Sequence, residues 1–94
     1  MDYDTARDLL TSTHAFPGSY TIKAIGRSAE AFVERVVAAA QMSLARAADV
    51  HYSVRSTPRG NHVAVTLELT VLSADEVLGV YEALRVVKGL RFLL

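Results

Sequence analysis

Few residues of this sequence have the types and spacing that binding or catalytic chemistry requires. A short turn combines the cation of Arg27 with the hydroxyl of Ser28 just before an expected helix, where an anion can bind. Gly26, Arg27 and Ser28 are therefore a candidate anion or ligand site. The sequence around them has no glycine-rich run and no G-x-x-x-x-G-K motif. The alternative is a plain strand-to-helix turn in which Ser28 caps the helix.

The histidines and acids predict neither a metal site nor a catalytic centre. His51 and His62 belong to an expected hairpin and can approach each other across it, but no third ligand has suitable spacing. Together with His14, they are expected to be surface residues. No motif places a serine nucleophile on a strained turn. We therefore predict a protein without enzymatic activity, catalytic residues, metal or cofactor.

The composition sets further limits on fold and function. The 94 residues include ten basic and ten acidic residues and no cysteine, so disulfides and thiolate metal sites are excluded. A chain of this size forms one small domain, and its neutral net charge argues against a dedicated nucleic-acid-binding protein. No stretch approaches the roughly 20 apolar residues of a membrane span. The acidic start is unlike a signal peptide, so we expect a cytoplasmic protein without a membrane partner.

The elements that must position these residues begin after a less regular segment. Residues 1–15 are expected to be loosely ordered or to form a short helix capped by Asp4, and residues 16–94 to form a single domain. In FPGSYTIKAIG, which opens the domain, the proline and first glycine indicate a turn. Alternating side chains then predict a strand over 20–25 that ends at Gly26.

A helix and a hairpin follow this first strand. Apolar residues at spacings of three and four predict a helix over about 29–45, with Ser28 as its N-cap and Glu30 at the positive end of its dipole. Strands are predicted over 50–55 and 63–71, joined by STPRGN. We expect a positive φ at Gly60 in this turn.

The last two elements are a second helix and a short strand. SADE (73–76) is a capping box at the start of the helix, and Gly89 is expected to be the C′ residue at its end. The closing LRFLL predicts a strand with Leu90, Phe92 and Leu94 on one face and Leu93 on the other.

The order β-α-β-β-α-β predicts an α+β protein with the ferredoxin-like sandwich. Its four strands form an antiparallel sheet in the order 4-1-3-2, with both helices on one face. The other face is mixed polar and carries a small apolar spot at Ile25 and Leu93, which residues 1–15 can cover. Lys23 and Glu68 are expected to pair across neighbouring strands. The candidate interaction surface on this open face consists of Lys23, Ile25, His51, Arg55, Thr66 and Glu68.

Four motifs resemble the YbeD-like family of small bacterial proteins of unknown function. They are FPGSYTIKAIG, Arg55 with STPRGNHVAVT, VYEAL and GLRFLL, which together span about 16–94 in the expected order. The resemblance implies a ferredoxin-like fold similar to ACT regulatory domains, with no established biochemical activity. ACT-like domains bind small ligands at a strand-to-helix turn or at an interface between sheets, and they usually pair.

Two classes of function stay open. The first is a regulatory or protein-interaction module that binds a protein partner, a small-molecule effector or a second copy of itself, through the open face or through an exposed edge of the second or fourth strand. The second is a weak nucleic-acid-binding protein that uses the open face, since RGNHVAVT is similar to a ribonucleoprotein signature. No aromatic residue is expected on that face, so base stacking is missing, which makes nucleic acid the less favoured partner.

Overall fold

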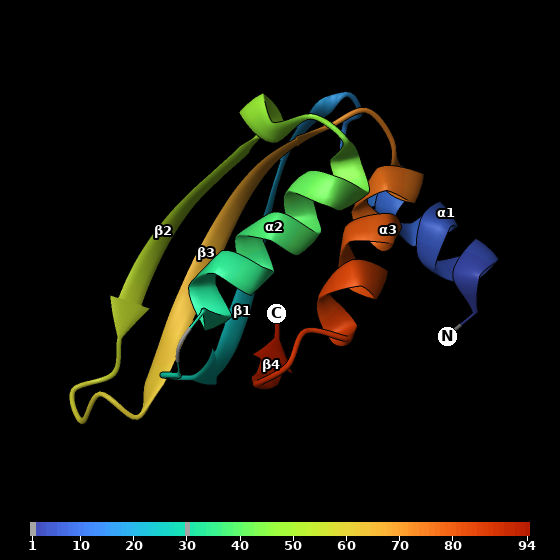
Figure 1. The fold of residues 1–94 in the computed structure, drawn as a ribbon. Coiled ribbons are helices and arrows are strands. Elements are labelled where there is room, and N and C mark those ends of the chain that lie inside the picture. The colour runs from blue at the N-terminus through green and yellow to red at the C-terminus, as the bar shows by residue number, and fades with distance from the viewer. Residues whose placement is uncertain (1, 30) are drawn as a thin grey trace.

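The structure is a computed structural model that describes residues 2–29 and 31–94. Its elements in chain order are α1 (Tyr3–Thr13), β1 (Gly18–Arg27), α2 (Phe32–Leu44), the 3-10 turn η1 (Ala47–Asp49), β2 (Val50–Ser56), β3 (His62–Val71), α3 (Ala74–Arg85) and β4 (Leu90–Leu93). The strands form one antiparallel sheet in the order β2-β3-β1-β4, which confirms the predicted order. Figure 1 shows α2 and α3 side by side on one face of this sheet.

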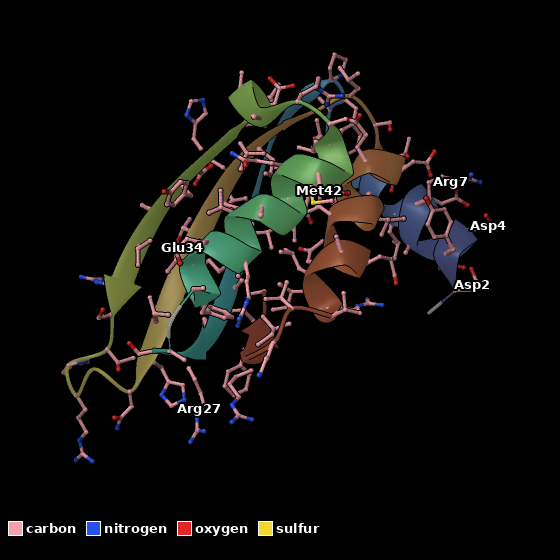
Figure 2. The ribbon with its side chains drawn as sticks, viewed as in Figure 1. Asp2, Asp4, Arg7, Arg27, Glu34 and Met42 are labelled. Carbon is pink, nitrogen blue, oxygen red and sulfur yellow. The ribbon has the colours of Figure 1, made fainter. Side chains whose placement is uncertain are left out.

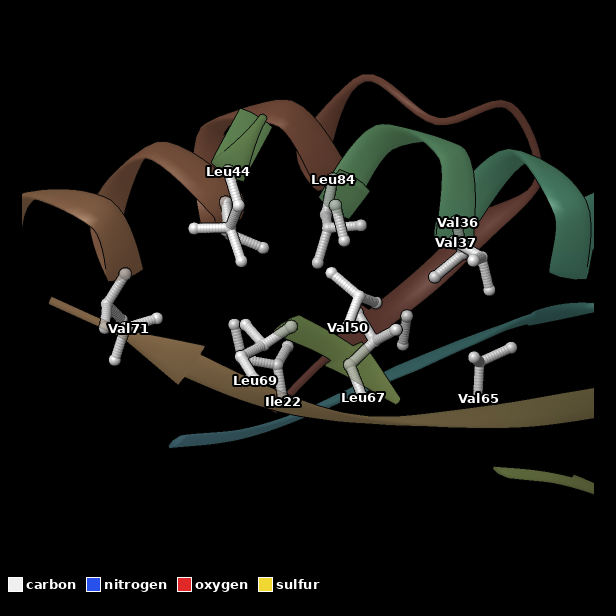
Figure 3. Packing of buried hydrophobic residues seen from close by; sticks show 14 of the residues in the cluster. Ile22, Val36, Val37, Leu44, Val50, Val65, Leu67, Leu69, Val71 and Leu84 are labelled. Atoms are coloured by element: carbon white, nitrogen blue, oxygen red, sulfur yellow. The ribbon is translucent and has the colours of Figure 1, made fainter. Parts of the chain in front are cut away.

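The core lies between the sheet and these two helices. The predicted inner faces of the two central strands are confirmed, because Ile22 and Ala24 of β1 and alternate residues of β3 from Val63 to Val71 are all buried. Figure 3 shows side chains from both layers meeting in this apolar interior. The helices contribute Phe32, Val36, Val37, Ala40, Leu44, Val77, Val80 and Leu84.

The two glycines of FPGSYTIKAIG allow close packing and not an unusual backbone conformation. A Cβ atom on Gly18 would lie 2.6 Å from the carbonyl oxygen of Ala15. A Cβ atom on Gly26 would lie 2.6 Å from the carbonyl oxygen of Gly89 and would collide with the ring of Phe32. The first residue of α2 therefore packs directly on the end of β1, and this contact determines where the turn between them lies.

The helix starts differ from the predictions in two places. α1 begins earlier than expected, because Asp2 is its N-cap and accepts a hydrogen bond from the backbone N–H of Thr5, so the prediction of Asp4 as the cap was wrong. Ser28 does not cap α2, because the helix begins later, at Phe32, after Ala31 with a φ of 64°. The prediction for Glu30 lies outside the described residues.

The turns around α3 bear out part of the predictions. The Ser73 hydroxyl accepts a hydrogen bond from the Glu76 backbone N–H, as a capping box requires, but the Glu76 carboxylate accepts from the N–H of Leu72. Gly89 has a positive φ of 96° but is not the C′ residue, because α3 ends at Arg85 and Gly89 lies in the turn before β4. The positive φ predicted for Gly60 is confirmed, at 73°.

A β-bulge changes the faces predicted for β4. Gly26 is opposite Leu90 while Ile25 is opposite Phe92, so Arg91 is an extra residue in the ladder. Leu90 and Leu93 both pack against the core as a result, whereas the side chain of Phe92 is 63% exposed. The prediction that Phe92 faces the helices and Leu93 faces solvent was therefore wrong.

The N-terminal helix α1 packs beside α3. Leu10 contacts the core, and the hydroxyl of Tyr3 donates a hydrogen bond to the carboxylate of Asp75 over 2.8 Å. Because α1 lies with the helices in Figure 1, it does not cover the open face of the sheet, which corrects that expectation.

Candidate functional site

A basic cleft of about 740 Å³ lies at one end of the sheet. It is formed where β1 ends, where the β2–β3 hairpin turns and where β4 begins, and Figure 1 shows these three segments together at the lower end of the molecule. Its lining residues are Arg27, Ser28, Ala29, Gly60, Asn61, His62 and Arg91.

Strand pairing brings the basic side chains of the cleft together. Arg27 is directly opposite His62 in the β1–β3 ladder, so the two side chains lie on the same face at the end of the sheet. Arg91 is the extra residue of the β4 bulge, and bulges commonly change the direction of a side chain. Figure 2 shows Arg27 extending away from the body of the protein at this end.

The backbone of the cleft is held by hydrogen bonds within the protein. The N–H of Ser28 donates to the carbonyl of Asn61 over 2.9 Å, and the N–H of Arg27 donates to the carbonyl of Gly89 over 3.2 Å. The N–H of Ala29 donates to the carbonyl of Arg27. These three backbone donors are therefore already used within the protein, and the cations of the cleft are its side chains.

The cleft contains part of the predicted anion site and adds residues that were not predicted. Arg27 and Ser28 line it, whereas Gly26 is buried beneath it against Phe32. His62 and Arg91 were missed as members, because they come from distant strands and no local motif marks them. The turn is therefore one wall of a larger cleft.

The opposite end of the sheet carries paired charges. The guanidinium of Arg46, which follows α2, donates to both carboxylate oxygens of Glu76 over 2.7 and 2.9 Å and also contacts Asp49. The hydrogen bonds from Arg46 hold the pKa of Glu76 below its ordinary value, and burial only partly opposes this effect. The other ion pairs between described residues, Arg7–Asp4 and Arg85–Glu82, also lie outside the cleft.

The predicted open-face residues do share one face of the sheet. In the ladders, Lys23 is opposite Thr66, and His51 is opposite Glu68. Glu68 accepts a hydrogen bond from the Thr21 hydroxyl over 2.8 Å, so the expected Lys23–Glu68 pair was wrong by two residues of register.

Arg55 and Ile25 complete this open face. Both are opposite Ala64 of β3, one on each side, and Ile25 is also opposite Phe92 of β4. The apolar spot therefore consists of Ile25 and Phe92, which means that an aromatic residue lies on the open face after all.

The histidines do not gather. His51 lies beside Glu68 and His62 beside Arg27, toward opposite ends of the hairpin, so the expectation that they approach each other was wrong. Within residues 2–29 and 31–94, no group of three or more histidine or acidic side chains could hold a metal ion.

The free edge of β2 exposes two large apolar side chains. Tyr52 and Val54 are opposite the buried Leu67 and Val65 of β3, so their side chains are on the helix-facing side. They are nevertheless 52% and 46% exposed, because this side of the strand reaches beyond the cover of α2. In the described part of the chain, β2 pairs only with β3.

The fold and these surfaces define a small α+β protein with a free sheet edge, an open polar face and a basic cleft. None of its described helices is both long and apolar enough to span a membrane. The family model described as "Protein of unknown function (DUF493)" matches residues 11–94, and the chain belongs to this family of small bacterial proteins. The resemblance to the YbeD-like family is thereby confirmed.

Curated relatives also match most of the chain. A UPF0250 protein of Shewanella sp. (strain ANA-3) is 35% identical over 78 residues, which cover 81% of this chain and 84% of that protein. A UPF0250 protein of Shewanella oneidensis is 30% identical over 76 residues, with the same coverage.

Proposed function

We propose that this protein is a non-enzymatic interaction module that pairs with a second copy of itself along β2. The proposal follows the ferredoxin-like, ACT-like resemblance, in which domains of this type usually pair. The observation that carries it is the free β2 edge, where Tyr52 and Val54 expose apolar surface beside unpaired backbone groups. Exposed strand edges are places where chains associate unless they are protected.

The two edges of the sheet differ in their protection. β4 has four residues and a bulge at Arg91, both of which are features that hinder pairing. β2 has seven residues, and between Val50 and Ser56 it contains neither proline nor lysine nor an acid. The β2 edge is therefore the better surface for adding a strand.

The sequence of β2 suits antiparallel pairing with itself. A two-fold axis at Ser53 would place Tyr52 of each copy opposite Val54 of the other. Both pairs would lie on the helix-facing side of the sheet. This arrangement covers the exposed apolar groups of both copies at once and continues the hydrogen-bond ladder.

The experiment that tests this proposal measures the oligomeric state of two lysine variants by sedimentation velocity. Val54→Lys places a charge in the proposed interface, and we expect it to convert a dimer into a monomer because edge lysines oppose strand pairing. Met42→Lys adds the same charge on the exposed surface of α2, where Met42 is 83% exposed, and should leave the dimer unchanged (Figure 2).

Two results would contradict the proposal. The first is that the wild-type protein sediments as a monomer at about 100 µM, a concentration above the dissociation constants of most specific dimers. Alternatively, Val54→Lys could dimerise as well as Met42→Lys while both retain the wild-type thermal midpoint. A far-ultraviolet circular dichroism spectrum of each variant checks that a loss of dimer is not a loss of fold, because dissociation alone lowers the thermal midpoint.

Nucleic-acid binding on the open face is a second candidate, because Phe92 adds an exposed aromatic ring beside Ile25. Titration of a single-stranded RNA octamer at several salt concentrations tests it. Phosphate contacts from Lys23 and Arg55 would make the affinity fall steeply with salt, and Phe92→Ala would weaken binding. If the octamer does not bind at low salt, this candidate is wrong.

A further inference from the structure

We propose that the basic cleft binds a small phosphate monoester with a polar body. The proposal is independent of the pairing along β2, because the cleft lies at the end of the sheet and its residues come from β1, β3, β4 and the hairpin turn. It rests on the kind, number and pairing of the side chains that line the cleft.

The donors of the cleft outnumber the acceptors that a carboxylate can supply. One guanidinium already matches the two oxygens of a carboxylate, and the cleft has both Arg27 and Arg91. His62 and the amide of Asn61 add further donors. A phosphate monoester brings three terminal oxygens and up to two negative charges, which suits two guanidinium groups and their neighbours.

The cations of the cleft have no competing partner in the described part of the chain. No carboxylate is among the described residues that line it, and the ion pairs of the structure involve Arg7, Arg46 and Arg85 instead. The cleft also opens three residues before α2, a helix of 13 residues whose positive dipole end favours an anion there. An anion would therefore add compensating charge where the described residues supply none.

The remaining lining indicates the body of the ligand. Apart from Ala29 and Gly60, the lining residues are polar, so the cleft offers little surface to an apolar group. Its volume of about 740 Å³ exceeds what a phosphate group fills. Ser28 and Asn61, which line the cleft, supply a hydroxyl and an amide that suit hydroxyl groups on such a body, as in a sugar phosphate.

Amide chemical shifts of the wild-type protein test the proposal. The probes are ribose 5-phosphate, inorganic phosphate and acetate at equal ionic strength. We expect ribose 5-phosphate to move the signals of Ser28, Ala29, Gly60, Asn61 and Arg91 and to saturate below about 10 mM, a weak but specific affinity. Inorganic phosphate should bind at the same residues at least threefold more weakly, and acetate should not saturate.

Two matched double variants test the role of the arginines. Arg27→Ala with Arg91→Ala should weaken ribose 5-phosphate binding at least tenfold. Arg7→Ala with Arg35→Ala removes the same net charge from α1 and α2 and should change the affinity less than twofold. All four side chains are on exposed residues, and the thermal midpoint of each variant checks its fold. His62→Asn, with an expected loss of at least twofold, provides a milder second test.

Five results would overturn the proposal. Shifts spread beyond the cleft, or equal losses in the two double variants, would mean non-specific attraction of anions. Equal affinity for inorganic phosphate and ribose 5-phosphate would mean that the cleft does not recognise the body of the ester. Saturable acetate binding would mean that the cleft does not select phosphate over a carboxylate. An RNA octamer that binds the same residues at least a hundredfold more tightly would assign the cleft to nucleic acid.

Discussion

The two ends of the sheet use arginine in opposite ways. At one end, Arg46 contacts Glu76 and Asp49 and joins the start of α3 to the turn after α2. At the other end, Arg27 and Arg91 line an open cleft together with His62, and no described carboxylate lines it with them. In the first arrangement the arginine stabilises the fold and has few donors left for a ligand. In the second, the arginine side chains remain available to bind an anion.

This difference shows how a neutral net charge can hide a local concentration of cations. Ten basic and ten acidic residues cancel in the composition, but the fold separates them. Acids cluster on α1 and at the start of α3, while the cleft concentrates cations. Net charge therefore describes the chain as a whole and does not describe the field at one end of the sheet.

The largest effect is expected where the cleft is attached to the core. Gly26→Ala should destabilise the protein by about 2–3 kcal/mol, because the new Cβ atom would collide with the ring of Phe32 and approach the carbonyl of Gly89. The free energy of unfolding, measured by denaturant titration, checks this. Loss of stability should be accompanied by loss of the cleft, since Phe32 and Gly89 flank two of its walls.

The control is the same substitution elsewhere. Gly79 lies within α3, where a Cβ atom would meet only the Ser43 hydroxyl at 3.4 Å. Gly79→Ala should be neutral or stabilising by up to about 1 kcal/mol, because alanine favours the helix. If Gly26→Ala were as mild as Gly79→Ala, the close packing that we assign to the end of β1 would be wrong.

The parts of the fold that could be predicted have a strong local signal. Period-two alternation in β1 and β3 indicated their inner faces, and the order of elements then indicated the strand order. The faces of β4 could not be predicted, because its bulge arises opposite Gly26, where the ring of Phe32 and the backbone of Gly89 meet. That packing joins residues that are distant in sequence, and no local pattern around Gly26 or Gly89 indicates it.

The candidate site was predictable to the same limited extent. Arg27 and Ser28 lie in one turn, so their proximity could be read from the sequence. His62 and Arg91 join them only through strand register, which alternation alone does not determine. The incorrect pairing of Lys23 with Glu68 has the same cause, since the ladder places Thr21 there instead.

At the end of the sheet where Arg46 is paired, we expect an intermediate effect on stability that depends on pH. Glu76→Gln should destabilise the protein at pH 7 by about 1 kcal/mol, because it weakens charge-assisted hydrogen bonds with Arg46. The pKa of Glu76 is lowered in the folded state, so its contribution is fully present above its unfolded pKa of about 4.5. The contribution is lost as the pH falls through the folded value. Denaturant titrations at several pH values should show the difference between wild type and variant shrinking in that range.

Glu82→Gln is the matched control on the same helix. Glu82 pairs with Arg85, but both side chains are largely exposed, so we expect the change to cost less than about 0.5 kcal/mol at any pH. A pH-independent loss for Glu76→Gln, or an equal loss for Glu82→Gln, would mean that the pairing at Arg46 does not distinguish this end of the sheet.

The smallest effects are expected at two alanines, one at each end of α2. Ala31 and Ala45 have φ values of 64° and 57°, a left-handed conformation that costs alanine more than glycine. Ala45→Gly should stabilise the protein by about 0.5–1 kcal/mol, since glycine is preferred where a helix ends, and should leave ribose 5-phosphate binding unchanged.

Ala31→Gly should give a similar gain in stability but a different result in binding. Ala31 lies between the cleft and the first residue of α2, so the added backbone freedom should loosen the turn that carries Arg27 and Ser28. We expect a loss of affinity for ribose 5-phosphate of about two- to threefold, on the order of 0.5 kcal/mol. Thermal midpoints and amide titrations of the two variants measure both quantities. If both variants bound ribose 5-phosphate equally well, the left-handed residue at the start of α2 would affect stability alone, like the one at its end.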